Sequence, residues 1–271
     1  RRLISCWSRR LLAASSAESV RVLLNSKSPR FPNGLANSSG LLGKNIMDTV
    51  GASLGGQIPL LENLPLHNED GAGEHVYAPW WLYREQLAGK LGFARGYHIE
   101  FASGRQMPGL GVANIDVFTQ GSYGRRFKED ARRYYGSLLS FSGRGEMIPN
   151  DDCFCELDPT VKDKWSIPVL RFHWKWSDHE YNQSKHMQET FRALIAEMGG
   201  TVHAPMPDRA QGYGLATGGT IIHELGGSRM GHDPRTSVVN AHCQAHDVEN
   251  LFVADGGPFV SQADKNPTWT I

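Results

Sequence analysis

The sequence is poor in cysteine. Its 271 residues include four cysteines, which are scattered along the chain: Cys6, Cys153, Cys155 and Cys243. That number is too small for a disulfide framework in a chain of this size, so we expect no disulfide-stapled fold. A reducing compartment is therefore allowed but not required, and the sequence leaves the location undecided between cytoplasm and periplasm.

Long apolar runs are also absent. The longest, such as Leu41-Leu42 and Ile221-Ile222, fall far short of the roughly 20 residues that cross a bilayer. Residues 1–7 place apolar side chains after two arginines, but this apolar segment is too short for a signal peptide. We expect no membrane span, and we interpret the first residue as a cut within a longer chain.

Charge of one sign does not dominate. The chain has 28 Lys plus Arg against 28 Asp plus Glu, which argues against a surface for nucleic acid or anionic membranes. A hydrophobic fraction of 40% with 10% aromatic residues excludes a disordered chain. The 30 glycines and 14 prolines indicate many turns, so we expect a mixed α and β protein rather than a helical bundle.

The glycine turn that binds dinucleotides is missing as well. Adenine-dinucleotide sites normally have Gly-x-Gly-x-x-Gly at the first strand, and both Gly71-Ala72-Gly73 and Gly109-Leu110-Gly111 lack the third glycine. We therefore expect any pyrophosphate-binding turn to lie outside this chain.

Two helices are predicted from local signals. Ser15-Ser16-Ala17-Glu18 has the pattern of a capping box, and apolar residues at helical spacing follow it. A long connection rich in Ser, Asn, Gly and Pro covers residues 26–43, and we place a domain boundary near residue 50. A second capping box at 177–180 begins a helix that ends at Gly199-Gly200. Its apolar stripe comprises Met187, Phe191, Leu194, Ile195 and Met198.

Short strands are predicted at residues 96–101, 137–142 and 167–176. In the last of these, aromatic and leucine side chains alternate with cationic ones from Leu170 to Trp176, which is typical of an antiparallel, half-buried strand. Residues 250–257 form an apolar strand followed by an acidic residue and two glycines. This pattern is typical of a buried strand whose carboxyl end brings backbone groups to a ligand.

Several separated motifs, taken together, resemble one known family. In order they are residues 13–19, 23–26 and 39–45, then His223 to Gly231, Asp233-Pro234 with Ser237 to Val239, Asn250 to Gly257, and Asn266 to Ile271. They resemble the middle and C-terminal segments of the glucose–methanol–choline oxidoreductases, FAD enzymes that oxidise alcohols and sugars. The resemblance extends from about residue 11 to the end and is nearest to bacterial gluconate 2-dehydrogenase-like flavoproteins.

The resemblance assigns a catalytic pair. His223 matches the active-site histidine of the family, and Asn266 matches its partner position, which holds His in some branches and Asn in others. Neutral imidazole titrates near the working pH, so His223 would remove the hydroxyl proton while a hydride leaves for flavin N5. Asn266 would donate to the same oxygen without competing for its proton. The alternative is that His223 is a structural strand-end residue and Asn266 only caps the turn before Pro267.

The resemblance also implies contacts with the flavin. Asp255 and Gly256 lie in what is interpreted as a strand-to-helix turn, where backbone amides meet a phosphate or ribityl chain. Pro267 and Thr268 would begin a helix whose first amides face the flavin O2 edge. The alternative is a pair of ordinary junctions without a ligand. Thr49, where relatives often have His after the Asp, departs from the family pattern.

Other candidates are weaker. Residues 242–246 offer imidazole and thiol groups, but no second ligand pair completes a tetrahedral metal site. Cys153 and Cys155 are expected to pack, and the aromatic pair Trp174 and Trp176 is more typical of a core than of a sugar-stacking floor. The arginine-rich residues 125–133 are expected to be solvated.

These observations lead to one prediction of organisation and function. The fold class is α/β plus α+β, with C-terminal pieces of an FAD-binding Rossmann-like domain and a substrate domain that has an antiparallel sheet with helices. We assign residues 1–50 to the middle segment of the flavin domain, 51–205 to the substrate domain and 206–271 to a return to the flavin domain. The chain would be a fragment, with the strands that pair with residues 250–255 expected outside it.

The predicted function is FAD-dependent oxidation of a CH–OH group on a small alcohol or sugar, with a dehydrogenase favoured over an oxidase and the electron acceptor unspecified. The alternative is a noncatalytic remnant that serves as a carbohydrate-binding or interaction module. Titration with FAD would distinguish the two.

Overall fold

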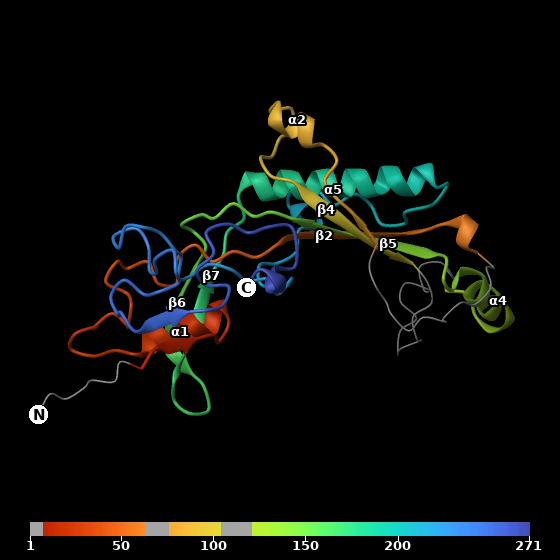
Figure 1. Ribbon diagram of the computed structural model, residues 1–271. Coiled ribbons are helices and arrows are strands. Elements are labelled where there is room, and N and C mark those ends of the chain that lie inside the picture. The colour runs from red at the N-terminus through yellow and green to blue at the C-terminus, as the bar shows by residue number, and fades with distance from the viewer. Residues whose placement is uncertain (1–7, 63–75, 104–120) are drawn as a thin grey trace, which may run out of the picture. The chain divides into compact units, whose positions relative to one another are not determined.

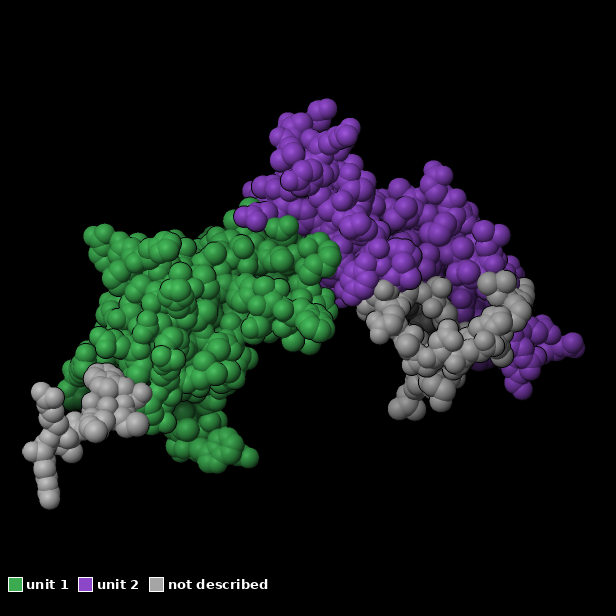
Figure 2. All heavy atoms as spheres, in the orientation of Figure 1, with its two compact units in different colours: residues 1–49, 146–177, 217–271 green, residues 50–145, 178–216 purple. Residues whose placement is uncertain are grey.

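The computed structural model describes residues 8–62, 76–103 and 121–271. The chain divides into two compact units (Figures 1 and 2): unit 1 comprises residues 1–49, 146–177 and 217–271, and unit 2 comprises residues 50–145 and 178–216. Residues 146–177 thus lie in unit 1, although the sequence analysis placed them within a segment from 51 to 205. Cys6 and the glycine pairs at 71–73 and 109–111 lie outside the described residues.

Unit 2 contains a four-stranded antiparallel sheet with the strand order β2-β5-β4-β3. The strands are β2 (Val50–Gln57), β3 (Val76–Ala78), β4 (Tyr97–Ser103) and β5 (Leu138–Gly145). The helices are η1 (Pro59–Leu61), α2 (Tyr83–Leu87), α4 (Gly124–Tyr134), α5 (Asp178–Glu197) and η2 (Gly212–Gly214). The predicted antiparallel sheet with helices is confirmed, and the arginine-rich residues form the solvated face of α4.

The long helix α5 lies along this sheet because the sheet offers glycines where the helix is bulky (Figure 1). Met187 and Phe191 are fully buried, and a Cβ added to Gly143 of β5 would lie 2.5 Å from Met187 Sδ. The predicted stripe is correct at these positions. Leu194, which the periodicity assigned to the same stripe, is 39% exposed, because the helix turns its 183, 187 and 191 positions toward the sheet.

Unit 1 is built around α1 (Ser16–Asn25), whose cap Ser15 accepts a hydrogen bond from the backbone of Glu18 at 3.5 Å, as the capping box predicts. Val20 and Leu23 of this helix are almost fully buried. The same hydrophobic cluster includes residues from the 26–43 connection and from the C-terminal segment. Residues far apart in sequence therefore share one core.

Strand β8 (Leu251–Val253) pairs in parallel with β1 (Arg10–Leu12). The expectation that its partner strands lie outside the chain is therefore wrong for this edge of β8. The prediction that a helix follows this strand is also wrong, because residues 254–264 form turns and bends. Close packing of the two glycines against residues 224–228, described below, accounts for this irregular path.

Strands β6 (Phe154–Lys162) and β7 (Pro168–His173) form an antiparallel hairpin. The predicted strand 167–176 is therefore shorter than expected, and Phe172 is 49% exposed rather than buried in an aromatic row. Trp174 and Trp176 follow the strand and meet edge to face, with ring centroids 5.2 Å apart. Among the helices in the described parts of the chain, none is long and apolar enough to cross a membrane.

Candidate functional site

The segment that carries His223 is held by one buried carboxylate. Asp48 is fully buried, and its Oδ2 accepts the backbone N–H groups of Gly219 at 2.9 Å and Ile221 at 3.2 Å. Its Oδ1 accepts the N–H of His223 at 3.1 Å and that of Thr49 at 2.8 Å. Residues 215–222, directly before His223, form no helix or strand, so this carboxylate supplies the backbone order that a regular element would otherwise provide.

A short backbone bridge fixes the same two segments a little further along. Met47 donates its N–H to the carbonyl of Leu225 at 2.8 Å, and Leu225 donates back to Met47 at 3.0 Å. Both side chains are buried. The backbone of His223 is therefore constrained on both sides, by Asp48 and by this bridge.

The imidazole of His223 is held through one of its nitrogens. Its Nδ1 lies 3.1 Å from Thr49 Oγ1, and Gln262 Nε2 donates to the same oxygen at 3.0 Å. Thr49 and Gln262 are 0% and 1% exposed, whereas His223 is half-buried. The contact with the buried hydroxyl fixes the orientation of the imidazole ring from inside the protein.

Asn266 lies four residues after Gln262, at the start of η3 (Pro267–Trp269). Its side chain makes no capping hydrogen bond to this 3-10 turn. Asn266 and Thr268 are exposed and Pro267 is half-buried. The helix predicted from Pro267 is a single 3-10 turn in which Thr270 donates to the Pro267 carbonyl at 2.8 Å.

The Asp255 turn faces the protein interior. Asp255 Oδ1 accepts the N–H of Gly257 at 2.8 Å, and Oδ2 accepts the hydroxyl of Ser19 on α1. A Cβ on Gly256 would lie 2.6 Å from Leu225 Cδ2, and one on Gly257 would lie 2.2 Å from Ser228 Oγ. The carboxylate therefore shapes the turn, while the glycines let residues 224–228 approach it closely.

Two buried oxygens near these segments have no hydrogen-bond partner within the described residues: Ser228 Oγ and Gln262 Oε1. Buried polar atoms are nearly always paired, so unpaired ones beside a candidate site fit a polar ligand. Ser228 packs against the Asp255 turn and Gln262 contacts the partner of His223. Both positions are thus compatible with a polar cofactor edge.

The other candidates from the sequence make contacts that serve packing or local structure. His246 Nε2 lies 2.9 Å from Ser237 Oγ, and the described residues contain no group of three His, Cys, Asp or Glu side chains suited to a metal ion. Cys153 and Cys155 are buried as expected, and burial raises the pKa of the Cys155 thiol to about 12. A Cβ on Gly218 would lie 2.2 Å from the indole of Trp174, so that ring packs on backbone.

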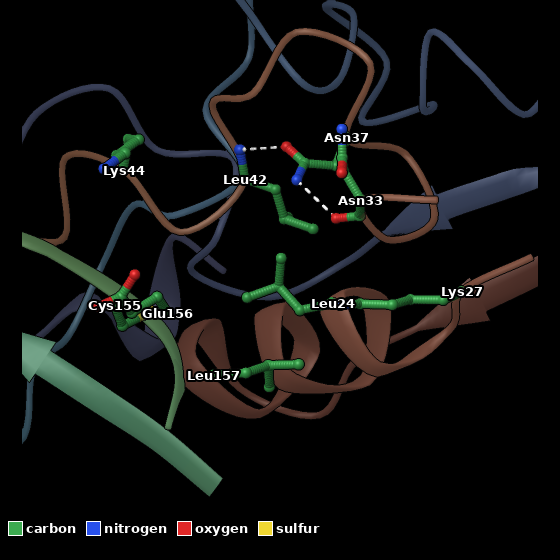
Figure 3. A pocket seen from close by; sticks show the side chains of 9 residues that line it. All are labelled: Leu24, Lys27, Asn33, Asn37, Leu42, Lys44, Cys155, Glu156 and Leu157. Carbon is green, nitrogen blue, oxygen red and sulfur yellow. Dashed lines mark hydrogen bonds between the residues drawn. The ribbon is translucent and has the colours of Figure 1, made fainter. Parts of the chain in front are cut away.

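A separate cavity of about 310 Å³ lies between the C-terminal part of α1, the 26–43 connection and β6 (Figure 3). In Figure 3, Leu24 and Leu42 point toward one another across it, and Asn37 Oδ1 accepts the Leu42 N–H at 3.1 Å. Its remaining lining residues are Lys27, Asn33, Lys44, Glu156 and Leu157, together with Cys155. None of them belongs to the His223 network.

Sequence reasoning missed two residues of that network. Asp48 and Gln262 were not assigned roles, and Thr49 was noted only as a departure from the family pattern. An acidic residue directly before a polar one was a weak signal for Asp48. Gln262 gave none, because its contact with Thr49 joins positions 213 residues apart.

The chain is similar to several known proteins. Residues 149–271 match the family model described as GMC oxidoreductase. The chain is 28% identical to 2-methyl-1,2-propanediol dehydrogenase of Mycolicibacterium austroafricanum, over 96% of the chain and 45% of that protein. It is 26% identical to the fructose dehydrogenase large subunit of Gluconobacter japonicus, over 96% of the chain and 44% of that protein.

A third relative is the gluconate 2-dehydrogenase flavoprotein of Pantoea cypripedii, 28% identical over 54% of the chain and 24% of that protein. The chain thus spans less than half the length of these relatives. Among solved structures, a formate oxidase of Aspergillus oryzae RIB40, in which FAD modification was studied, matches with a TM-score of 0.63 and 14% identity. That match covers 97% of this chain and 52% of the oxidase, and it confirms the predicted fold class.

Proposed function

Because this chain carries the C-terminal region of a glucose–methanol–choline oxidoreductase, we propose that it supplies the catalytic half of an FAD-dependent enzyme that oxidises a CH–OH group of an alcohol or sugar. FAD is the cofactor of this family, whose members are dehydrogenases and oxidases of such substrates. The relatives' names include an alkanediol and a sugar as substrates, which supports a small polyhydroxylated molecule here.

The observation that carries the proposal is the double restraint on His223. Its backbone N–H is bound by Asp48 at 3.1 Å and its Nδ1 lies 3.1 Å from Thr49 Oγ1. A general base is efficient when it is held in place and titrates near the working pH, as imidazole does. His223 takes the hydroxyl proton of the substrate onto its imidazole ring. The bound flavin would accept the hydride from the same carbinol carbon.

Asn266 acts on the same substrate oxygen. Its exposed side chain offers N–H donors that can bind the hydroxyl oxygen without removing its proton. Placed at the start of η3, it is four residues from Gln262, which contacts the partner of His223. Asn266 therefore keeps the oxygen in register while His223 removes the proton.

The residues proposed to contact FAD fit a polar group. Asp255 holds a glycine turn in which Gly256 has no room for a side chain, and Ser228 Oγ beside that turn is buried without a partner in the described residues. Pro267 and Thr268 begin an accessible turn. We assign Asp255 and Gly256 to backbone contacts with the cofactor. We assign Pro267 and Thr268 to contacts with the edge of its ring.

The test is His223→Ala in the polypeptide that contains these residues. Flavin reduction by substrate should slow by on the order of 10² to 10⁴, the usual contribution of a positioned base, while bound flavin is retained. Stopped-flow absorbance at the flavin band measures the rate. His242→Ala removes an exposed histidine of the same unit and should leave it unchanged.

Asn266→Ala should slow flavin reduction less than His223→Ala. The double substitution should cost less than the sum of the two, because both groups act on one oxygen. An unmutated rate for His223→Ala would overturn the base assignment, and fully additive losses would overturn the shared oxygen.

A further inference from the structure

We propose that Ile222 is a specificity-determining residue, whose side chain forms an apolar wall for an alkyl group next to the CH–OH carbon of the substrate. Ile222 directly precedes His223, and its side chain is 76% exposed. This inference rests on the proposed base role of His223. It adds the class of substrate, which is an alcohol or diol that carries an alkyl group beside the reacting carbon.

The backbone of Ile222 has an unusual conformation. Its φ of 61° lies in the left-handed region, which is a genuine outlier for a β-branched residue. Of the seven non-glycine residues with positive φ in the described parts of the chain, Ile222 is the only one with a β-branched side chain. Asparagine or glycine would adopt this conformation at lower cost. The backbone alone therefore does not account for isoleucine at this position.

Asp48 imposes this conformation. Its Oδ2 accepts the N–H of Ile221 at 3.2 Å, and its Oδ1 accepts the N–H of His223 at 3.1 Å. The amides on both sides of Ile222 are thus bound to one fully buried carboxylate. Strain of this kind persists only where the surroundings fix the backbone, and it is concentrated at functional sites. The backbone from which the isoleucine side chain projects is therefore held together with that of the base.

The side chain of Ile222 is not used in packing unit 1. It is not part of the hydrophobic cluster of that unit, and Ile221 beside it is half-buried whereas Ile222 is exposed. Strain and exposure both count against isoleucine here, so its advantage lies in contact with a ligand. A substrate whose hydroxyl is bound by His223 brings the neighbouring carbons close to the adjacent residue. Isoleucine favours an alkyl group there and disfavours a hydroxyl, which would lose its hydrogen bonds to water.

The strain is tested by unfolding in urea. Ile222→Asn in the full polypeptide should raise the urea midpoint by about 0.3 M, because it relieves one strained residue and removes a side chain that packs little. Ser166→Asn is the matched control. Ser166 has a φ of 66° and is exposed in the loop between β6 and β7 of the same unit, so its replacement should also raise the midpoint. A lower midpoint for Ile222→Asn would show that this side chain stabilises the fold and would overturn the argument from strain.

Specificity is tested with two diols that differ by one methylene, 1,2-propanediol and 1,2-butanediol. Stopped-flow reduction of the flavin at several diol concentrations gives the rate constant divided by the dissociation constant for each. We expect the unmutated protein to favour butanediol by about fourfold, the effect of one buried methylene. Ile222→Asn should abolish this preference, and Ile222→Val should retain most of it. The limiting rate with propanediol should stay within about threefold in both variants, because proton removal by His223 is unchanged.

The outcomes separate this inference from the proposed function. If His223→Ala slows flavin reduction but Ile222→Asn keeps the preference for butanediol, the role of Ile222 is wrong and the base role stands. The same holds if D-fructose reduces the flavin in a His223-dependent way and neither diol does. If the preference disappears in Ile222→Asn while His223→Ala leaves the rates unchanged, the apolar wall exists but the proposed function is wrong. Loss of the preference in Ser166→Asn would show a general structural effect and would overturn the role of Ile222.

Discussion

Asp48→Asn should destabilise the protein and loosen the segment that carries His223. The carboxylate is fully buried and its two oxygens accept four backbone N–H groups, two on each. A carboxamide has the same shape but only one oxygen. Two of the four donors would therefore face an NH₂ group, which cannot accept from them.

The size of the effect follows from this inventory. Hydrogen bonds to a charged group are worth about 1.5–3 kcal/mol each, so two lost bonds correspond to about 3–6 kcal/mol. Removing a buried charge also removes its desolvation penalty, which offsets part of that loss. We expect a net decrease of about 2–4 kcal/mol in the free energy of unfolding, a large fraction of the roughly 5–15 kcal/mol typical of a domain.

Equilibrium unfolding in urea measures the total decrease in the free energy of unfolding, and amide hydrogen exchange shows which residues are affected. We expect faster exchange of the backbone amides in one of two pairs of residues, either Gly219 and Ile221 or Thr49 and His223. Which pair is affected depends on whether the single oxygen of the asparagine takes the place of Oδ1 or of Oδ2. Asp158→Asn is the matched control. Asp158 also accepts backbone N–H groups, from Thr160 and Val161 at 2.8 Å, but all through Oδ1 and in an irregular part of strand β6.

In the control, a single amide oxygen can keep these bonds, so Asp158→Asn should leave the urea midpoint nearly unchanged. Equal urea midpoints for Asp48→Asn and the unmutated protein, with unchanged exchange at all four amides, would refute the role given to Asp48.

Two further predictions concern groups with shifted pKa values. Burial raises the pKa of the Cys155 thiol to about 12, so iodoacetamide at pH 8 should modify half-buried Cys243 and spare Cys155 until the protein unfolds, as mass spectrometry would show; labelling at equal rates would contradict this. The hydrogen bond from Arg21, 2.6 Å away, lowers the pKa of Asp163. A lowered folded-state pKa means that the stabilisation is present above the unfolded-state pKa and is lost as pH falls through the folded value. Arg21→Met should therefore reduce stability at neutral pH and weaken its loss in acid, and parallel pH profiles of thermal unfolding would contradict the pairing.

The parts of the fold that sequence could predict are those fixed by neighbouring residues. The helix at 16–25 follows from a serine cap and apolar spacing within a few turns, and the helix at 178–197 follows from the same signals. The parallel pairing of Arg10–Leu12 with residues 251–253 joins segments about 240 residues apart, and no local pattern encodes it. The error about the partner of β8 arose from that distance.

The candidate site divides in the same way. His223 was found because a family motif surrounds it, and Asp255 because glycines follow a strand. What makes His223 a candidate base, however, is its environment. Asp48, which binds its backbone, is 175 residues away in sequence, and Gln262 contacts the Thr49 hydroxyl that lies against its ring. A threonine or a glutamine gives no functional signal in a sequence, because the backbone alone can satisfy the hydrogen-bonding groups of either side chain. Their role follows only from the structure, where the Thr49 hydroxyl accepts from the Gln262 amide and contacts the imidazole of His223.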